Sequence, residues 1–413
     1  MGPDLPLTPS ETEGGVGGAV RPIGLRREGS ILQVQQQQQI PADNFDEYSP
    51  SAVAQDALSV DTVHLDDLLR EACAKGSSDI HVTVGLPPIV RTDGSLVGLN
   101  YEPMSPGQTQ RLIYDILSNE QIQVFERTHE LDFSYGVRNI GRFRVNVYKQ
   151  RGSVGAAMRS IPAKIPSFEE LGLPPVLREL NRKHSGLVLV TGPTGSGKST
   201  SIACMIDNIN SERPVHIMTI EDPIEYLHRH KRGMINQREL HQDTDSFGNA
   251  LRAVLREDPD VVLIGEMRDL ETIAAALTLA ETGHLVFGTL HTRSAPQTVD
   301  RVIDVFPPHQ QDQIKVLLSN TIEGIVAQQL VPRIGGGRVA AIEVMVATSA
   351  IRNLIREGKT FQIYSALETG AQFGMQTMDK TLALLHSTGK ITYEEAAARA
   401  IDKESFKRYV SGE

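Results

Sequence analysis

The pattern of apolar and polar positions changes character twice along the 413 residues. Up to about residue 60 it shows no period. Between residues 61 and 161 helical and alternating strand patterns are mixed, which is typical of a small α+β domain. From residue 185 short apolar runs alternate with helical stretches, and this predicts an α/β core with a buried parallel sheet.

The predicted first domain, residues 61–161, opens with an amphipathic helix. Short strands are expected next, with a turn at Asp93-Gly94. Two further helices and three longer strands complete it. In chain order, the predicted elements are 63–74 (helix), 79–83 and 89–91 (strands), 108–117 and 121–128 (helices), and 131–137, 142–148 and 155–161 (strands).

Four prolines follow this domain, and residues 162–184 are therefore interpreted as a hinge or linker. The predicted α/β core covers residues 185–348 and a helical C-terminal region covers 349–413. The predicted core strands are 187–190, 216–220, 260–264, 284–289 and 339–346. The predicted helices are 200–210, 247–256, 270–281, 350–356, 360–368, 378–387 and 393–398.

Composition sets residues 1–60 apart from the rest. They are acidic and contain a glycine-rich stretch at 14–18 and the glutamine run 35–39. Such a segment buries too little apolar surface to offset the entropy of ordering, so it is interpreted as a disordered tail. The alternative is a docking segment, or a coiled-coil nucleus around residues 31–40.

Charge and composition exclude several protein classes. Only Cys73 and Cys204 are present, too few for a disulfide framework or a four-cysteine zinc module. The net charge of −10 and the absence of Trp argue against a dedicated nucleic-acid binder. No apolar run is long enough for a membrane span or a signal peptide, which favours a cytosolic chain without direct membrane insertion.

The strongest chemical signal is a phosphate-binding loop that follows an apolar strand and precedes a helix. Its glycines let main-chain N–H groups face phosphates, its lysine reaches the β- and γ-phosphates, and its serine hydroxyl is a ligand for Mg²⁺. The residues are Gly192, Pro193, Thr194, Gly195, Ser196, Gly197, Lys198, Ser199 and Thr200.

Carboxylates at two strand ends could serve the metal or the attacking water. Glu266 ends the apolar run 260–264, with Gly265 at the place where many such enzymes have Asp. Glu221, Asp222 and Glu225 follow another predicted strand, and ligand groups gather at such ends. Solvated loop acids are the alternative interpretation.

Histidines and arginines give weaker signals. His284 and His291 flank one predicted strand and could either sense the γ-phosphate or be buried structural residues. Several arginines, among them Arg144 and Arg159, lie on strands of the first domain. Ordinary surface placement is the alternative to a role in neutralising charge on the phosphates.

Five segments together resemble the secretion ATPase superfamily, and most closely the retraction ATPases of type IV pili. The resemblance covers residues 61–409. GPTGSGKST (192–200), TIEDPIEY (219–226), LREDPDVVLIGEMRD (255–269) and GHLVFGTLHT (283–292) are similar to its Walker A, Asp box, Walker B and His box. SSDIHVTVGLPPIVRTDG (77–94) is similar to its N-terminal domain signature.

This resemblance implies a PAS-like N-terminal domain and a RecA-like motor domain, assembled as a homo-hexameric ring. It implies that Glu266 is the catalytic glutamate, that Glu225 serves Mg²⁺, and that Arg144 and Arg159 reach the phosphates. Glu281, His284 and His291 would form the His box. Arg293, where the family often has Asn, departs from the pattern. ATP and Mg²⁺ are the implied substrate and cofactor.

The implied function is an ATP-hydrolysing motor for pilus retraction and twitching motility at the cytosolic face of the inner membrane. Its partners would be an integral platform protein and a paralogous retraction ATPase. Segment 350–359 resembles the element associated with retraction. The alternatives are an accessory retraction ATPase, an extension or secretion ATPase, which usually carries a four-cysteine zinc insert, and a nucleic-acid motor.

Overall fold

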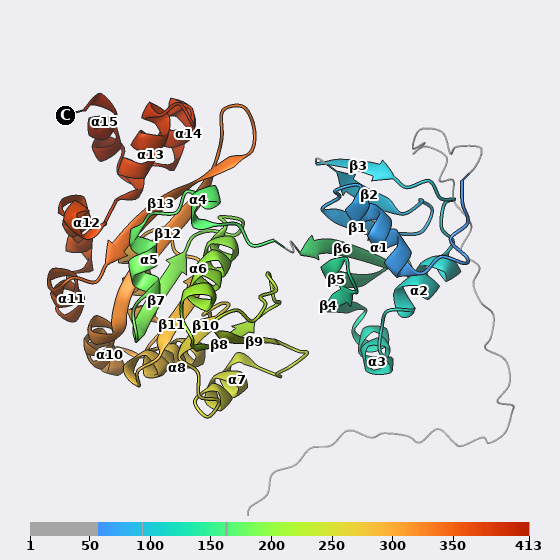
Figure 1. Cartoon of the computed structure of the whole chain (residues 1–413), viewed down its shortest axis with the longest axis horizontal. Coiled ribbons are helices and arrows are strands. Elements are labelled where there is room, and N and C mark those ends of the chain that lie inside the picture. The colour runs from blue at the N-terminus through green and yellow to red at the C-terminus, as the bar shows by residue number, and fades with distance from the viewer. Residues whose placement is uncertain (1–56, 93, 162–163, 413) are drawn as a thin grey trace, which may run out of the picture. The chain divides into compact units, whose positions relative to one another are not determined.

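The computed structural model describes residues 57–92, 94–161 and 164–412, which form two domains of different architecture (Figure 1). The segment predicted as a disordered tail lies outside the described residues up to residue 56. Leu58 already forms a bridge with Tyr101, and Val60 is buried in the first domain. The first domain therefore begins a few residues before Asp61.

The first domain contains a six-stranded antiparallel sheet in the order β3-β2-β1-β6-β5-β4. Alternate residues of its long strands, such as Phe143, Val145 and Val147, are buried. The strands are β1 (Asp79–Val82), β2 (Ile89–Thr92), β3 (Ser95–Gly98), β4 (Glu130–Val137), β5 (Gly141–Gln150) and β6 (Ser153–Ile161). Strand β3, whose residues are exposed, was not predicted from the sequence.

Three helices pack their apolar sides on the buried residues of this sheet. Helices α2 and α3 each begin with a capping box, in which Ser105 pairs with Gln108 and Ser118 with Gln121. This arrangement satisfies main-chain N–H groups that a helix start otherwise leaves unpaired. The helices are α1 (Leu65–Ala74), α2 (Pro106–Tyr114) and α3 (Asn119–Thr128).

The second domain is built on a seven-stranded sheet in the order β13-β12-β7-β11-β10-β8-β9. Every neighbouring pair is parallel except β12 with β13, which is antiparallel. The sheet is therefore mixed, with one antiparallel edge. Its strands are β7 (Gly186–Thr191), β8 (His216–Glu221), β9 (Met234–Glu239), β10 (Val261–Ile264), β11 (Leu285–Leu290), β12 (Ile322–Pro332) and β13 (Arg338–Val346).

Helices cover both faces of this sheet, because successive side chains of a strand point to opposite faces. Leu187 and Leu189 of β7 belong to one apolar cluster, and Val188 and Val190 belong to another. The first cluster is closed by α7 (Phe247–Val254), α8 (Leu270–Glu281), α9 (Ala295–Asp304), α10 (Pro308–Thr321), α11 (Ser349–Arg356) and α12 (Ile363–Thr369). The second is closed by α4 (Phe168–Leu171), α5 (Val176–Asn181) and α6 (Lys198–Glu212).

The stretch interpreted as a hinge holds two of these helices. Phe168, Leu173, Leu177 and Leu180 of this stretch are buried in the cluster around β7. Most of residues 164–184 therefore pack as part of the second domain.

The chain ends in three helices beside strands β12 and β13: α13 (Met378–Ser387), α14 (Tyr393–Arg399) and α15 (Lys403–Ser411). Buried Glu343 of β13 binds two helix starts, accepting from the main-chain N–H of Ala295 in α9 at 2.7 Å and of Met378 in α13 at 3.3 Å. Burial raises the pKa of Glu343 to about 7. One carboxyl group thus ties the C-terminal helices to α9.

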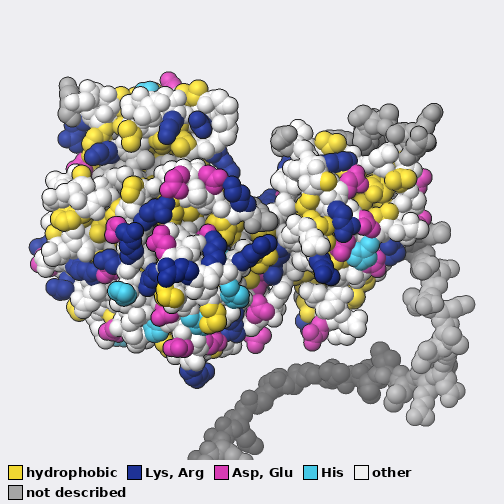
Figure 2. All heavy atoms as spheres, viewed as in Figure 1, with side chains coloured by type: hydrophobic (Ala, Val, Ile, Leu, Met, Phe, Trp, Pro, Cys, Tyr) yellow, Lys and Arg dark blue, Asp and Glu magenta, His cyan; other side chains and the backbone are white. Residues whose placement is uncertain are grey.

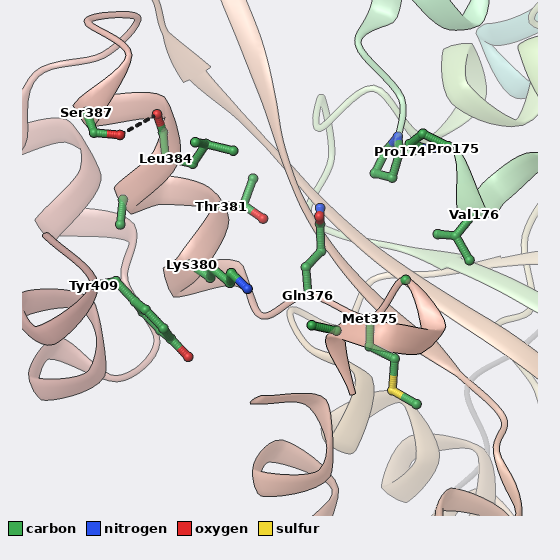
Figure 3. A pocket seen from close by; sticks show the side chains of 13 residues that line it. Pro174, Pro175, Val176, Met375, Gln376, Lys380, Thr381, Leu384, Ser387 and Tyr409 are labelled. Atoms are coloured by element: carbon green, nitrogen blue, oxygen red, sulfur yellow. Dashed lines mark hydrogen bonds between the residues drawn. The ribbon is translucent and has the colours of Figure 1, made fainter. Parts of the chain in front are cut away.

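A hollow of about 570 Å³ lies between the start of α5 and helix α13 (Figure 3). It is lined mainly by apolar side chains, among them Pro174, Val176, Met375 and Leu384. Lys380 supplies a positive charge, but no carboxylate lines the hollow. It lacks the groups that phosphate chemistry needs, so the chemical site has to lie elsewhere.

Acidic and basic side chains are interspersed on the face of the molecule seen in Figure 2. Such a surface differs from the continuous basic stripe that follows a nucleic-acid backbone. Within the described residues, no helix is both long and apolar enough to cross a bilayer.

Candidate active site

The phosphate-binding loop connects β7 to α6, with glycines at its bends. Gly195 and Gly197 have φ of 76° and 87°, in the left-handed region that favours glycine. Gly192 is required for space as well, because a Cβ there would come within 2.2 Å of the carbonyl oxygen of Gln328. The sequence motif and the backbone geometry agree at these positions.

Gln328 of β12 holds the loop from behind. Its Nε2 donates to the carbonyl of Ser196 at 2.7 Å, and its Oε1 accepts from the hydroxyl of Ser201 at 2.8 Å. The side chain is buried, so both amide groups are satisfied inside the protein. Strand β12, next to β7, therefore holds both the loop and the first turn of α6 in place.

Lys198, the first residue of α6, points back over the loop. Its Nζ donates to the carbonyl oxygens of Gly192 at 2.7 Å and Pro193 at 3.1 Å. Desolvation lowers the pKa of Lys198, and the charges of Glu266 and Glu225 oppose that shift. The ammonium group thus lies in the field of both candidate acids.

The carboxyl ends of the parallel strands bring the predicted chemical groups to one edge of the sheet. A hollow of about 570 Å³ at this edge is lined by the loop, by the acids after β8 and by Glu266 after β10. His291, directly after β11, lines it as well. Parallel α/β sheets bind their ligands at this edge. The lining includes side chains with ammonium, hydroxyl, carboxylate, guanidinium and imidazole groups: Lys198, Ser199, Glu225, Glu266, Arg268 and His291.

Glu266 is held by two donors. Arg268 binds it through Nε to Oε1 and through Nη2 to Oε2, both at 2.6 Å, and His291 Nε2 lies 2.9 Å from Oε1. The hydrogen bond from Arg268 is the main cause that lowers the pKa of Glu266. This carboxylate is therefore ionised at neutral pH and has a fixed orientation.

The acids after β8 differ in environment. Glu221 is buried, accepts from Thr219 Oγ1 at 2.8 Å, and has its pKa raised to about 6 by burial. Asp222 and Glu225 are exposed in the hollow. Glu221 is thus a structural acid, whereas Glu225 is free to face a ligand.

The residues present fit a magnesium ion shared with a substrate. In the described part of the chain, no group of three or more His, Cys, Asp or Glu side chains could hold a metal by itself. Mg²⁺ is usually held by one or two protein oxygens together with substrate phosphates. The hydroxyl of Ser199 and the carboxylate of Glu225 line the same hollow and supply oxygens of this kind.

The two histidines are placed at opposite ends of β11. His291 lies at the phosphate edge, but His284 precedes the strand, and its Nδ1 lies 3.0 Å from the carbonyl oxygen of Leu279. Six residues of strand separate the two ends by about 20 Å. Exposed Glu281 lies near His284 in the sequence, at the end of α8. Within one chain, the structure does not bring His284 to the hollow, and a role there would need a second copy.

Arg144 and Arg159 are directly opposite each other on β5 and β6. Arg144 lines the hollow. Arg159 is exposed and binds Asp79 Oδ1 at 2.8 Å. Asp79 already neutralises the charge of Arg159, whereas the charge of Arg144 is available at the hollow. Of the two predicted arginines, the structure brings one to the candidate site.

Two functional side chains were missed in the sequence. Gln328 lies in a strand that was not predicted. Arg268 was included in the Walker B segment, but no role was assigned to it. A basic residue two positions after a strand-ending glutamate is a usable signal, because both side chains then start from one short loop.

Comparison with protein families matches residues 54–336 to the family described as Type II/IV secretion system protein. The chain is 51% identical over 340 residues to the type IV pilus retraction ATPase PilT of Pseudomonas aeruginosa, covering 82% of this chain and 99% of that protein. It is 43% identical over 339 residues to the type IV pilus ATPase PilU of the same organism, covering 82% and 89%.

The fold is also similar to a solved structure, a crystal structure of the pilus retraction motor PilT with bound ADP. The TM-score is 0.80 at 52% sequence identity, and the match covers 84% of this chain and 99% of that chain. The fold described here is thus shared with a PilT structure that holds a bound nucleotide.

Proposed function

The chain belongs to the type II/IV secretion system protein family, and we propose that it is an ATP-hydrolysing motor that powers retraction of type IV pili. One observation carries the proposal: a complete phosphate-binding loop lies beside Glu266 in a chain 51% identical to PilT along 99% of that relative. The similarity to PilU at 43% is lower, which favours the main retraction motor over an accessory one.

Hydrolysis would use the groups in the hollow in separate roles. Lys198 would exchange its two carbonyl partners for the β- and γ-phosphate oxygens, and the loop N–H groups would bind the same phosphates. Ser199 and Glu225 would hold Mg²⁺, which supplies charge neutralisation on the phosphates when bound. A second hollow, of about 340 Å³, borders the loop at Gly197 and Thr200 and offers space for the nucleoside.

Glu266 would position the attacking water. Its carboxylate is ionised and oriented by His291, so it can accept a hydrogen bond from water and take up its proton. Arg144 would stabilise charge on the leaving phosphate, as arginines do in phosphoryl transfer. Arg159, opposite it on β6, would join it only after leaving Asp79. His291 would sense the phosphate through its contact with Glu266.

We further propose that six copies form a ring, with a PAS-like first domain in each copy. The ring would lie at the cytosolic face of the inner membrane, where an integral platform protein of the pilus links it to the fibre. A paralogous retraction ATPase would be a second partner. ATP binding would draw the two domains of a chain together, and phosphate release would let them part.

The decisive experiment deletes the gene and counts surface pili and twitching zones. A retraction motor should leave cells with abundant pili that do not move, and the wild-type gene should restore movement. Complementation with Glu266→Gln should restore protein but not movement.

Other outcomes identify the alternatives. Cells without pili would indicate an extension ATPase and contradict the proposal. Normal movement that is lost only when a second ATPase gene is also removed would indicate an accessory motor. DNA-stimulated ATPase activity in the purified chain would favour a nucleic-acid motor.

A further inference from the structure

Arg268 forms a two-pronged ion pair with the carboxylate proposed to activate water. Both of its donors lie 2.6 Å from different oxygens of Glu266, and the side chain of Arg268 is 70% exposed, whereas that of Glu266 is 22% exposed. The two residues share the short loop between β10 and α8. This guanidinium therefore reaches from solvent over the catalytic carboxylate.

The pair works against catalysis by Glu266 while it persists. A carboxylate whose two oxygens both accept from a cation has a lowered proton affinity, and this is the direction of the pKa shift of Glu266. It also has fewer lone pairs available for water. A base that must take a proton during hydrolysis is thus weakened by its own neighbour.

Arg268 has reasons to leave this partner. It lies in the field of Asp222 as well as Glu266, and it lines the same hollow as Lys198 and Ser199. A guanidinium binds phosphate oxygens in the same forked geometry as a carboxylate, and a terminal phosphate carries more charge. Glu266 and a γ-phosphate in this hollow would therefore compete for one guanidinium.

We propose that Arg268 is a γ-phosphate ligand that exchanges Glu266 for the terminal phosphate of ATP, so that the carboxylate is released to water only beside a triphosphate. This inference rests on the proposed ATPase function. It gives the chain a means of coupling the readiness of its base to the presence of the phosphate to be cleaved. ADP, which lacks that phosphate, leaves the pair intact.

The test is a double-mutant cycle read by calorimetry on the full-length protein. Wild type, Arg268→Gln, Glu266→Gln and the double variant are titrated with the non-hydrolysable β,γ-imido analogue of ATP and with ADP, both with Mg²⁺. Arg268→Gln should weaken the analogue by about tenfold or more, the effect of a charge-assisted hydrogen bond, and should change ADP by less than about twofold. Glu266→Gln should tighten the analogue, because the guanidinium no longer has a charged competitor.

The double-mutant cycle measures the competition between Glu266 and the γ-phosphate for the guanidinium of Arg268. The tightening caused by Glu266→Gln should vanish when Arg268 is also replaced. Arg252→Gln, which breaks the exposed ion pair between Arg252 and Glu271 on α7 and α8, is the matched control and should change neither affinity. Arg268→Lys, which keeps the charge without the fork, should fall between wild type and Arg268→Gln.

Two results would overturn the inference: equal weakening of ADP and the analogue by Arg268→Gln, or tightening by Glu266→Gln that persists in the double variant. The proposed function fails differently, because a wild-type chain that binds neither nucleotide would remove the ATPase itself. If the double-mutant cycle gives the expected affinities but deletion of the gene causes no retraction defect, the exchange stands and only the assignment to pili is removed.

Discussion

At the scale of single residues, buried polar side chains organise this protein. Gln328 satisfies the carbonyl of Ser196 in the phosphate loop and the hydroxyl of Ser201 in α6, and Glu343 binds the first N–H groups of α9 and α13. The strand that holds Glu343 was predicted and the one that holds Gln328 was not, but the role of neither side chain could be read from the local sequence pattern. Both side chains act through hydrogen bonds to segments that are far away in the sequence.

Lys198 and Glu266 should separate nucleotide binding from hydrolysis. Lys198→Ala should weaken ATP by about 10- to 100-fold, the 1.5–3 kcal/mol of a hydrogen bond to a charged group. Glu266→Gln should not weaken ATP binding but should lower kcat by about 10²- to 10⁴-fold, since a general base acts only in the transition state. Calorimetry and steady-state ATPase assays measure the two effects. Equal loss of ATP affinity in both variants would contradict this division.

Glu343 should make stability depend on pH. Its pKa rises from 4.5 to about 7 on folding, so the folded chain keeps the proton between these values. That stabilisation is complete below about pH 4.5 and is lost as the pH rises through 7, by up to about 3 kcal/mol. Gln at this position copies the protonated acid and does not titrate. The melting temperature of Glu343→Gln should therefore rise relative to wild type from pH 5 to pH 8, and a constant difference would contradict the explanation.

At the scale of elements, helix α11 shows a division between packing and free surface. Ile351 and Ile355 are fully buried in the core, whereas Asn353 and Arg356 are exposed. Arg352 is anchored to Glu323 at 2.6 Å and to the carbonyls of Ser319 and Asn320. The segment that resembles the retraction element is thus a fixed helix with one solvent-facing side.

Exposed positions of α11 should uncouple hydrolysis from retraction. Asn353→Ala and Arg356→Ala should change stability by less than about 0.5 kcal/mol and leave ATPase activity intact, yet abolish twitching. Ile355→Ala is the packing control and should cost about 2–5 kcal/mol. Twitching assays and thermal melts compare them. Full movement in both surface variants would leave α11 a core helix only.

The sequence predicted the elements with strong periods and missed those that depend on tertiary partners. The strand runs 187–190, 216–220 and 260–264 and the helix at 270–281 were found. At the phosphate edge the loop, Glu225, Glu266 and His291 were found as well, but no role was assigned to Arg268. Strand β9 was missed because it is a half-exposed edge strand. Helices α9 and α10 and strand β12 were missed because polar residues interrupt their apolar positions, and the reason for such residues, as at Gln328, lies in contacts with distant segments. Helix α5 was missed because the prolines before it were interpreted as a hinge, although proline is also common at the start of a helix.

At the scale of the whole molecule, the proposed ring allows a test of where the arginines act. We expect Arg144 to serve the phosphate of its own chain, since it lines the hollow with Lys198. Mixing Arg144→Ala chains with Lys198→Ala chains, each inactive alone, should then restore no ATPase activity. Recovery in mixed rings would show that the arginine acts across subunits. A mixture of wild type with Lys198→Ala, assayed in parallel, measures how far one dead member inhibits a ring.

Removal of residues 1–56 should leave assembly and ATPase activity nearly unchanged, because their composition offers no apolar core. The deletion has to stop there, since Val60 is buried in the first domain. Size-exclusion chromatography and thermal melts check the outcome. A large fall in melting temperature, or loss of the oligomer, would show that the segment is structural.

The backing of the phosphate loop by main-chain atoms has a consequence for inhibitor resistance. At Gly192 any side chain would meet the carbonyl of Gln328 at 2.2 Å, and the loop offers its N–H groups, which no substitution removes except proline. A compound that binds these N–H groups would leave the cell few escape mutations that preserve the motor. A compound that relies on exposed side chains outside the phosphate site, such as that of Arg252, would be evaded by a single base change.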